Sequence, residues 1–181
     1  MSISDGVSNN YIHQINELYI VACGGFDGQA VVKSCFRYSF STDQWEQLSD
    51  MDQPRRYSAS VMLESDTMWV MGGEGNSDDD GSKHTTEFIN QKGPGPLLPV
   101  PMAFHCAARV NASHVFIGGN LILEDEPELA RQAYLVETKS MTFHRLPDMT
   151  QPKFAAGCGV LDFVKDGRLQ RYYYLEWNGI F

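Results

Sequence analysis

The sequence predicts an all-β fold built from repeated units of about four short strands. Three observations support this fold class. An apolar run that ends in a glycine pair occurs three times, at residues 17–25, 67–73 and 114–119. The second glycines of these pairs stand 48 and 46 residues apart. Short runs rich in Val, Ile, Phe and Tyr alternate with turn-forming residues between them. A fixed period of this length indicates a repeat architecture.

Composition and charge limit the class of protein. The 181 residues suit one domain or one piece of a repeat array, and 43% apolar with 12% aromatic residues are enough to build a core. The net charge of −9 argues against nucleic acid as a partner. No apolar run reaches the ~18 residues of a membrane helix, so no membrane is expected as a partner. Residues 1–6 lack the pattern of a signal peptide.

The strands are expected in the same order in each unit. In the first unit we predict strands at residues 11–15, 18–23, 30–40 and 44–48. In the second we predict strands at 57–63, 67–71 and 85–89, before the interruption at 93–96. In the third we predict strands at 104–110, 115–117, 134–137 and 142–146. A fourth unit supplies strands at 155–164 and 171–175 and lacks the glycine pair.

The repeats resemble the kelch motif, in which a strand ending in Gly-Gly is followed by Tyr, Trp and a Met-x-x-Pro-Arg-like junction. The first unit matches with Gly24, Gly25, Tyr38, Trp45, Met51, Pro54 and Arg55. The second keeps Gly72 and Gly73, and the third keeps Gly118 and Gly119 with Phe143 in place of Trp45. Three recognisable repeats and a partial fourth therefore span nearly the whole chain.

The resemblance implies an incomplete kelch-type β-propeller of about three and a half four-stranded blades. It predicts a single partial propeller over residues 1–181, with blades at about 11–51, 55–98, 102–147 and 152–177. The glycine pairs then have a structural role where strands end against a neighbouring blade, and Tyr38 and Trp45 pack between blades. Propellers close with 4 to 8 blades, so we expect either a fragment of a longer protein or self-association through open edges.

The same resemblance implies a protein-interaction module whose partner, another protein, is not identified. Its contact face is formed by the loops between strands two and three and by the junctions between blades. The predicted binding residues on this face are Phe26, Arg55, Arg56, Tyr57, Glu74, Phe104, His105, Lys153 and Phe154. The competing interpretation is that the Arg and aromatic residues pack between blades.

An enzyme is the alternative, as a fragment of a kelch-fold oxidase related to galactose oxidase. Such enzymes bring tyrosines and histidines to a copper ion, and the five histidines here show no such pattern. We therefore expect no enzyme, no cofactor and no metal site. Residues 76–87 place Asn76, Asp78, Asp80, Gly81 and Glu87 as in an EF-hand loop, but Lys83 and the flanking strands do not fit that motif.

Four cysteines and one sequon bear on location. Cys23 and Cys35 meet across a hairpin if their strands pair, and then either form a disulfide or stay as buried thiols. Cys106 and Cys158 are expected to lie too far apart to pair. Asn111 begins a glycosylation sequon in a predicted turn. The first cysteine pair and the sequon favour an extracellular location over a cytoplasmic one.

Overall fold

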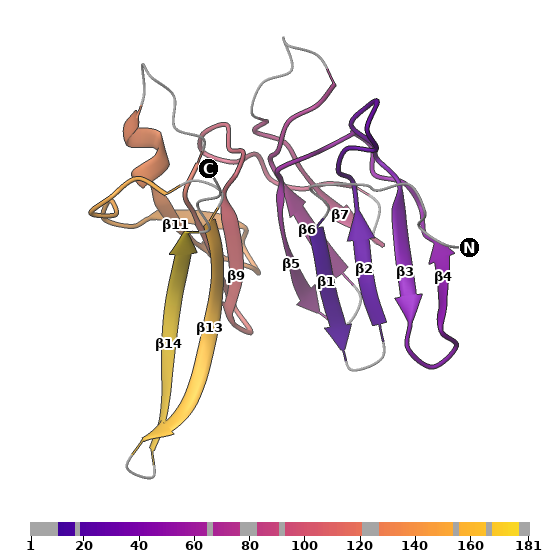
Figure 1. The fold of residues 1–181 in the computed structure, drawn as a ribbon. Coiled ribbons are helices and arrows are strands. Elements are labelled where there is room, and N and C mark those ends of the chain that lie inside the picture. Colours follow the sequence, from indigo (N-terminus) through magenta and orange to yellow (C-terminus); the bar gives the residue numbers. More distant parts are fainter. Residues whose placement is uncertain are drawn as a thin grey trace. The chain divides into compact units, whose positions relative to one another are not determined.

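A computed structural model describes residues 11–16, 19–64, 67–76, 83–90, 93–120, 127–153, 156–165 and 168–177 (Figure 1). The chain divides into two compact units, Met1–Ala103 and Phe104–Phe181. Within the described residues, every regular element is a β-strand except for one short 3-10 helix. The predicted all-β fold class is confirmed.

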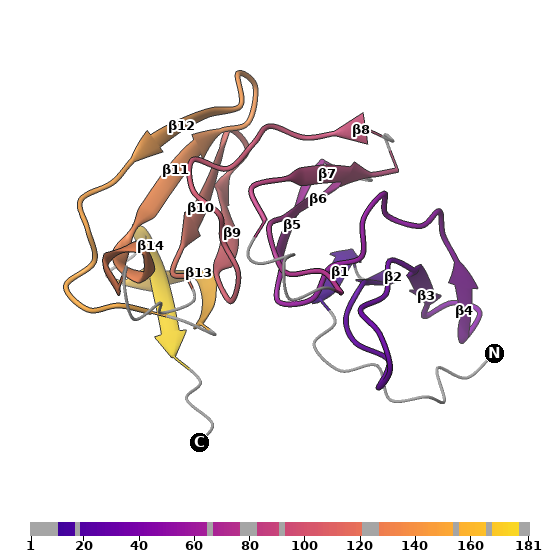
Figure 2. The ribbon, with the colours of Figure 1, turned by 90° about the horizontal axis from the view of Figure 1, so that it is seen from above.

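The first unit contains two four-stranded antiparallel sheets. The first sheet has the order β1-β2-β3-β4 and comprises β1 (Tyr11–Asn16), β2 (Tyr19–Cys23), β3 (Cys35–Ser39) and β4 (Gln44–Gln47). The second has the order β5-β6-β7-β8 and comprises β5 (Ala59–Glu64), β6 (Thr67–Met71), β7 (Thr86–Ile89) and β8 (Gly93–Pro94). Each strand pairs with the next one in the chain, as in a propeller blade (Figure 2).

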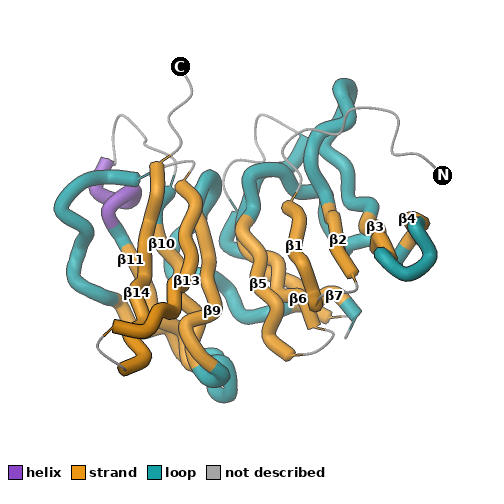
Figure 3. Tube along the Cα trace, turned by 60° about the horizontal axis from the view of Figure 1, so that its bottom comes forward, coloured by secondary structure: helices purple, strands orange, loops and turns teal. Residues whose placement is uncertain are grey.

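The second unit repeats this arrangement once and adds a hairpin. Its four-stranded sheet has consecutive strands paired and comprises β9 (Cys106–Asn111), β10 (His114–Gly118), β11 (Ala133–Glu137) and β12 (Thr142–Arg145). The 3-10 helix η1 (Pro127–Arg131) precedes β11. The hairpin consists of β13 (Ala156–Lys165) and β14 (Arg168–Trp177). Strand β13 lies beside β9 (Figure 3). The blade boundaries and the single-propeller organisation stay predictions.

The third strand of the first sheet is shorter than the predicted run at residues 30–40. Pairing begins only at Cys35, and the preceding residues form a loop. The Asp27 carboxylate holds the start of this loop by accepting hydrogen bonds of 2.8 Å from the N–H groups of Ala30 and Gln29. These two donors lower the pKa of Asp27. The Val and Phe residues of this run favour a strand, and their presence does not reveal a turn held by one side chain.

The core of the first unit lies between its two sheets. Val21, Cys23 and Cys35 project from the first sheet onto Met68, Val70 and Ile89 of the second, with Met51 beside them. Side chains alternate along a strand, so the neighbours of Val21 point to the opposite face of the first sheet. All seven cluster residues are buried. Burying an aliphatic side chain or a methionine contributes roughly 1.5–3 kcal/mol, so this layer contributes substantially to the stability of the unit.

Backbone hydrogen bonds join the end of each second strand to the junction that leads to the next sheet. The N–H of Gly25 donates to the Arg55 carbonyl, and the N–H of Gly73 donates to the Met102 carbonyl, both at 2.8 Å. In the second unit the Asn120 N–H donates to the Lys153 carbonyl at the same distance. The junctions of the three sheets are therefore built alike.

Glycine is required at Gly24 because the junction approaches its backbone closely. Its φ is 66°, in the left-handed region, and a Cβ there would collide with the Arg55 carbonyl oxygen. The same Cβ would lie 2.8 Å from the Cε of Met51. Any side chain at this position must displace the segment that leads from the first sheet to the second.

The third glycine pair is displaced by one residue from the predicted alignment. Gly119, with φ of 79°, takes the position of Gly24, and the buried Asn120 takes the position of Gly25. Gly118 is instead the last residue of β10, paired with Ala133, and it has no positive φ. A Cβ on Gly118 would lie 2.7 Å from the Phe116 ring, so packing explains this glycine. The sequence alone does not distinguish two adjacent glycines.

We predict that Gly24→Ala lowers the free energy of unfolding by about 3 kcal/mol or more, and Gly28→Ala by only about 1–2 kcal/mol. Both residues have a positive φ, which is strained for alanine, but nothing lies within 4 Å of a Cβ on Gly28. The difference between the two losses of unfolding free energy measures the cost of the collision with the Arg55 carbonyl. Urea unfolding of both variants tests this, and equal losses would show that the close approach relaxes without cost.

Candidate interaction face

Three predicted binding residues of the first unit form one contact group, which we call the Arg56 cluster: Arg56, Tyr57 and Glu74. Arg56 and Glu74 exchange backbone hydrogen bonds of 3.0 and 2.8 Å. Their side chains form an ion pair of 3.3 Å, and the Arg56 guanidinium lies 5.1 Å from the centre of the Tyr57 ring. All three residues are half-buried. A guanidinium, a phenol and a carboxylate are thus fixed together where β6 ends and β5 is entered.

Tyr57 has a backbone conformation that aromatic residues rarely adopt. Its φ is 56°, and Phe104, which stands before β9 as Tyr57 stands before β5, has φ of 57°. The left-handed conformation costs roughly 1–2 kcal/mol for a residue with a Cβ. Such strain persists only where the surrounding structure imposes it, and it is frequent at functional sites. The two aromatic residues therefore mark equivalent positions of the two units.

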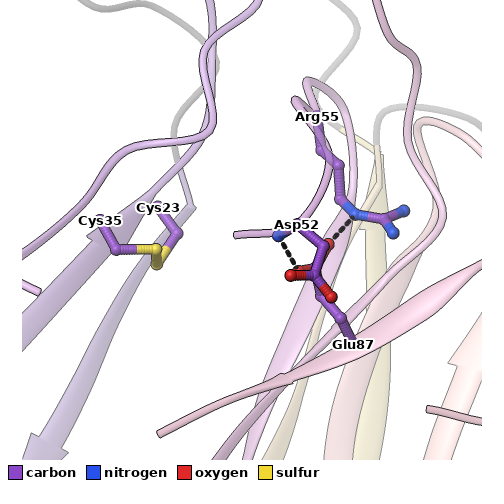
Figure 4. Close-up of a disulfide and its surroundings, with 5 residues drawn as sticks. All are labelled: Cys23, Cys35, Asp52, Arg55 and Glu87. Atoms are coloured by element: carbon purple, nitrogen blue, oxygen red, sulfur yellow. Dashed lines mark hydrogen bonds and ion pairs between the residues drawn. A yellow bond between two sulfur atoms is a disulfide. The ribbon is translucent and has the colours of Figure 1, made fainter. Parts of the chain in front are cut away.

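Arg55 lies beside this cluster in the sequence, but its side chain is buried in the junction (Figure 4). Its Nε donates to Glu87 Oε1 at 2.7 Å, and its Nη1 donates to the carbonyls of Gly72 and Thr85 at 2.7 and 3.0 Å. The Asp52 N–H donates to the second Glu87 oxygen at 2.7 Å. Arg55 therefore connects the chain between the sheets to β7 and to the end of β6.

The burial of Arg55 argues against its predicted role in binding. Its side chain is 2% exposed and that of Glu87 is 6% exposed, so a partner does not reach either charge. Removing one member of such a pair typically costs ~3–5 kcal/mol because the other charge stays buried. Burial also supports the interpretation, open at the sequence level, that an Arg at the junction packs between blades. The structure gives Arg55 a role in joining the two sheets.

The predicted binding residues of the second unit are in different environments. Phe104 and Lys153 are half-buried, and Lys153 supplies the junction carbonyl. Phe154 lies outside the described residues. His105 is buried, with 3% of its surface exposed. Phe104 and Lys153 therefore stay candidates for contact with a partner, whereas His105 is inaccessible.

His105 has no hydrogen-bond partner for either ring nitrogen within the described part of the chain. Burial penalises the charged imidazolium and lowers the pKa of His105 to about 3. The ring is therefore neutral at neutral pH and acts as a core residue. At the equivalent position the second sheet has the small, buried Ser58.

Asn76 connects the two loops next to the Arg56 cluster. Its Oδ1 accepts from the Val31 N–H at 2.5 Å, and its Nδ2 donates to the Val31 carbonyl at 2.8 Å. Phe26 is half-buried in the same loop as Val31 and forms a β-bridge with it. The loop after β2 is thus tied to the loop after β6. Residues 77–82, which carry most of the EF-hand-like pattern, lie outside the described residues.

The aromatic pair of the first repeat lies on the face of the first sheet that points away from the second. The rings of Tyr38 and Trp45 are 5.2 Å apart, and Phe40, which is 48% exposed, lies 5.2 Å from Tyr38. The Tyr38 hydroxyl donates to Asp43, and this bond to a carboxylate raises the pKa of Tyr38. Tyr38 and Trp45 are only half-buried within this chain.

Cys23 and Cys35 are cross-strand partners in β2 and β3 and are joined by a disulfide in the core of the first unit (Figure 4). Asn111 ends β9 and is exposed, and its Oδ1 accepts from the Ser113 N–H at 2.8 Å. A sequon in an exposed turn is the geometry in which glycosylation occurs.

Sequence reasoning did not find Glu87 and Asn76 as structural residues of the junction. Glu87 follows Thr85 and Thr86 in a predicted strand, and its side chain is buried in the structure. A charged residue within an apolar strand is the signal that indicates a buried ion pair. Asn76 belongs to the EF-hand-like pattern in the sequence. Its hydrogen bonds to Val31 join residues 45 positions apart, so no pattern in the sequence around Asn76 indicates them.

The strand order and the repeated junctions define these sheets as blades of the β-propeller type. A family model described as the kelch motif matches residues 17–52, which cover β2 to β4 and the start of the junction. The first blade is therefore a kelch repeat, and the predicted resemblance is confirmed there. Among curated proteins, none matches the chain.

Two further findings concern the described residues. They contain no helix that is long and apolar enough to cross a membrane. They also contain no group of three or more His, Cys, Asp or Glu side chains placed to hold a metal ion.

We predict that the neutral His105 makes the protein less stable in acid. The unfolded chain binds a proton at His105 near pH 6.5, but the folded chain does so only near pH 3. Unfolding therefore takes up a proton between these values, and stability falls as the pH falls. The free energy of unfolding should drop between pH 6 and 4 by about 1.4 kcal/mol per pH unit more than in His105→Asn.

Chemical unfolding at several pH values measures how the unfolding free energy of each protein changes with pH. The carboxylates contribute equally to this change in the wild type and in His105→Asn, so the difference between the two proteins reports on His105. Parallel curves for the two proteins would mean that folded His105 takes up a proton readily, and hence that it is accessible.

Proposed function

We propose that the chain is a protein-interaction module and that the Arg56 cluster is the centre of its contact surface in the first unit. Kelch repeats commonly mediate protein–protein interaction, and the first blade is such a repeat. The observation that carries the assignment to this surface is the cluster itself. Arg and Tyr are the residues most enriched at the centres of protein interfaces.

The cluster is held in place before any partner arrives. The Arg56 side chain is 34% exposed, so it is accessible, while its ion pair with Glu74 and its contact with Tyr57 limit its motion. Ordering a long side chain on binding costs about 0.5–1.5 kcal/mol, and fixed side chains avoid much of this cost. Phe26, held in the adjoining loop, extends the surface with an aromatic ring. Arg55 and His105, which are buried, are not part of it.

The alternative is an oxidase of the kelch fold. We propose that the chain is not an enzyme, because its histidines lack the pattern that such oxidases share. Metal analysis and oxidase assays of a natural protein that carries this chain distinguish the two functions. Bound copper with turnover would support the enzyme.

We predict that Arg56→Ala weakens partner binding by about thirtyfold or more, whereas Arg37→Ala leaves it unchanged. Arg37 is a matched control because it is 35% exposed, pairs with Glu46 and lies 4.8 Å from the Tyr19 ring, but it stands in β3 away from the loops. Loss of a central Arg typically costs ~2 kcal/mol or more, which is about a thirtyfold loss of affinity.

The measurement compares proteins retained from an extract by the wild type and by both variants, followed by titration of the retained partner. Equal retention by all three proteins would place the contact surface elsewhere.

We also propose that a second copy of this chain is a partner, through the outer face of the first sheet, defined as Ile20, Phe36, Tyr38 and Trp45. The corresponding face of the second sheet, with Met68, Val70 and Ile89, is buried against the first sheet. The outer face is the equivalent face of the first sheet, but its side chains are only half-buried. In the second unit, β14 pairs with β13 alone within the described residues, which leaves a strand edge of the kind that promotes association.

We predict that the chain associates with itself and that Trp45→Lys shifts it toward a monomer of 20.3 kDa. A charge on the outer face opposes its burial against another blade. Leu97→Lys is the control, because Leu97 is 66% exposed and lies outside the outer face. Light scattering over a concentration series gives the mass. If the wild type is still a monomer at the highest concentration, the outer face does not bind a second copy and the proposal is wrong.

A further inference from the structure

The two remaining cysteines, Cys106 in β9 and Cys158 in β13, lie next to each other in the second unit. Their thiols are close enough to form a hydrogen bond, which raises the pKa of Cys106 together with burial. The sequence-based expectation that they lie too far apart is wrong. That expectation places the two cysteines in the first strands of adjacent blades and assumes a wide separation between these strands. In the structure β13 packs directly along β9 (Figure 3).

We propose that Cys106 and Cys158 form a second disulfide, which links the four-stranded sheet of the second unit to the β13–β14 hairpin. Strands β9 and β13 are end strands of separate sheets, and no ladder hydrogen bonds between them are formed. The cysteines are 52 residues apart in the sequence, so the bond closes a long loop. The covalent link would hold together two sheets that otherwise only pack.

The surroundings of the two thiols favour this pairing over two inert buried thiols. Cys106 is 6% exposed and Cys158 is half-buried, so a reagent reaches Cys158 first. The backbone N–H of Gly118, the cross-strand partner of Cys106, donates toward its sulfur, which offsets only a small part of the rise in the pKa of Cys106 caused by the contact with Cys158 and by burial. In the second sheet the corresponding first-strand positions are Ala59 and Ser60, so blade packing does not itself demand sulfur.

The other cysteine pair of the chain is oxidised, which supports disulfide formation at Cys106 and Cys158. Cys23 and Cys35 are joined by a disulfide in the same chain. Conditions that oxidise that pair also supply the oxidant for Cys106 and Cys158. The required oxidant class is a small-molecule disulfide.

The reaction is two thiol–disulfide exchanges. The Cys158 thiolate attacks one sulfur of oxidised glutathione, forms a mixed disulfide and releases one glutathione thiolate. The Cys106 thiolate then attacks the Cys158 sulfur, forms the protein disulfide and releases the second glutathione. The two protein thiols lose two electrons and two protons, and oxidised glutathione gains them.

Peptide mapping under native oxidation tests the proposal. The full chain is incubated in glutathione buffers from reduced to fully oxidised, quenched with acid, alkylated in denaturant and digested with trypsin. The four cysteines fall in four different peptides, at residues 1–33, 34–37, 93–109 and 154–165. We expect the last two peptides to be linked, and we expect Cys158→Ser to remove this link while leaving the link between the first two.

Thermal melting gives a second readout. The oxidised wild type should melt on the order of 10 °C above oxidised Cys158→Ser, because the bond restricts a long loop in the unfolded chain. Alkylated Cys106 and Cys158 in fully oxidised buffer, with the Cys23–Cys35 link present, would overturn the proposal. Links between the two cysteine pairs would overturn it as well.

Discussion

The contact on which each blade junction depends is a backbone hydrogen bond between the end of a second strand and a junction carbonyl. It recurs at Gly25, Gly73 and Asn120 with one N···O distance, 2.8 Å. The residue before each donor has a positive φ, and at Gly24 and Gly119 a side chain would strike the carbonyl it approaches. This hydrogen bond explains the spacing of the glycines. A glycine is needed at the point where each second strand ends against a junction, and that point occurs once in every repeat.

Around this backbone contact the first unit adds a charged one. The carbonyl of Arg55 accepts the bond from Gly25, and its side chain donates to Glu87 and to the Gly72 carbonyl at the end of β6. One residue thus contacts the first sheet through its backbone and the second through its side chain. Because the ion pair is buried, the two sheets lose much of their stability together if the junction opens. We expect the two sheets of this unit to unfold as one cooperative element.

The strands and the repeat were predictable because their signals are local, whereas the site depends on long-range pairing. Alternating apolar residues and glycine pairs locate β2, β6 and β10 to within a residue or two. The offset at Gly118 was not predictable, since either of two adjacent glycines fits the pattern. An Arg-Arg-Tyr sequence indicated binding, but only Glu87 and Glu74 decide which arginine is buried and which stays accessible. The contact between Cys106 and Cys158 depends on how β13 packs against β9.

The amide of Asn76 has a consequence for how a partner is recognised. It pairs with both the N–H and the carbonyl of Val31, the two groups through which an extended peptide would add to this loop. Strand addition, a common mode of peptide binding, requires such backbone groups to be free. At Val31 this mode is blocked by the protein itself. A partner that meets this loop must be selected by its side chains, so its sequence rather than its extended conformation determines the fit.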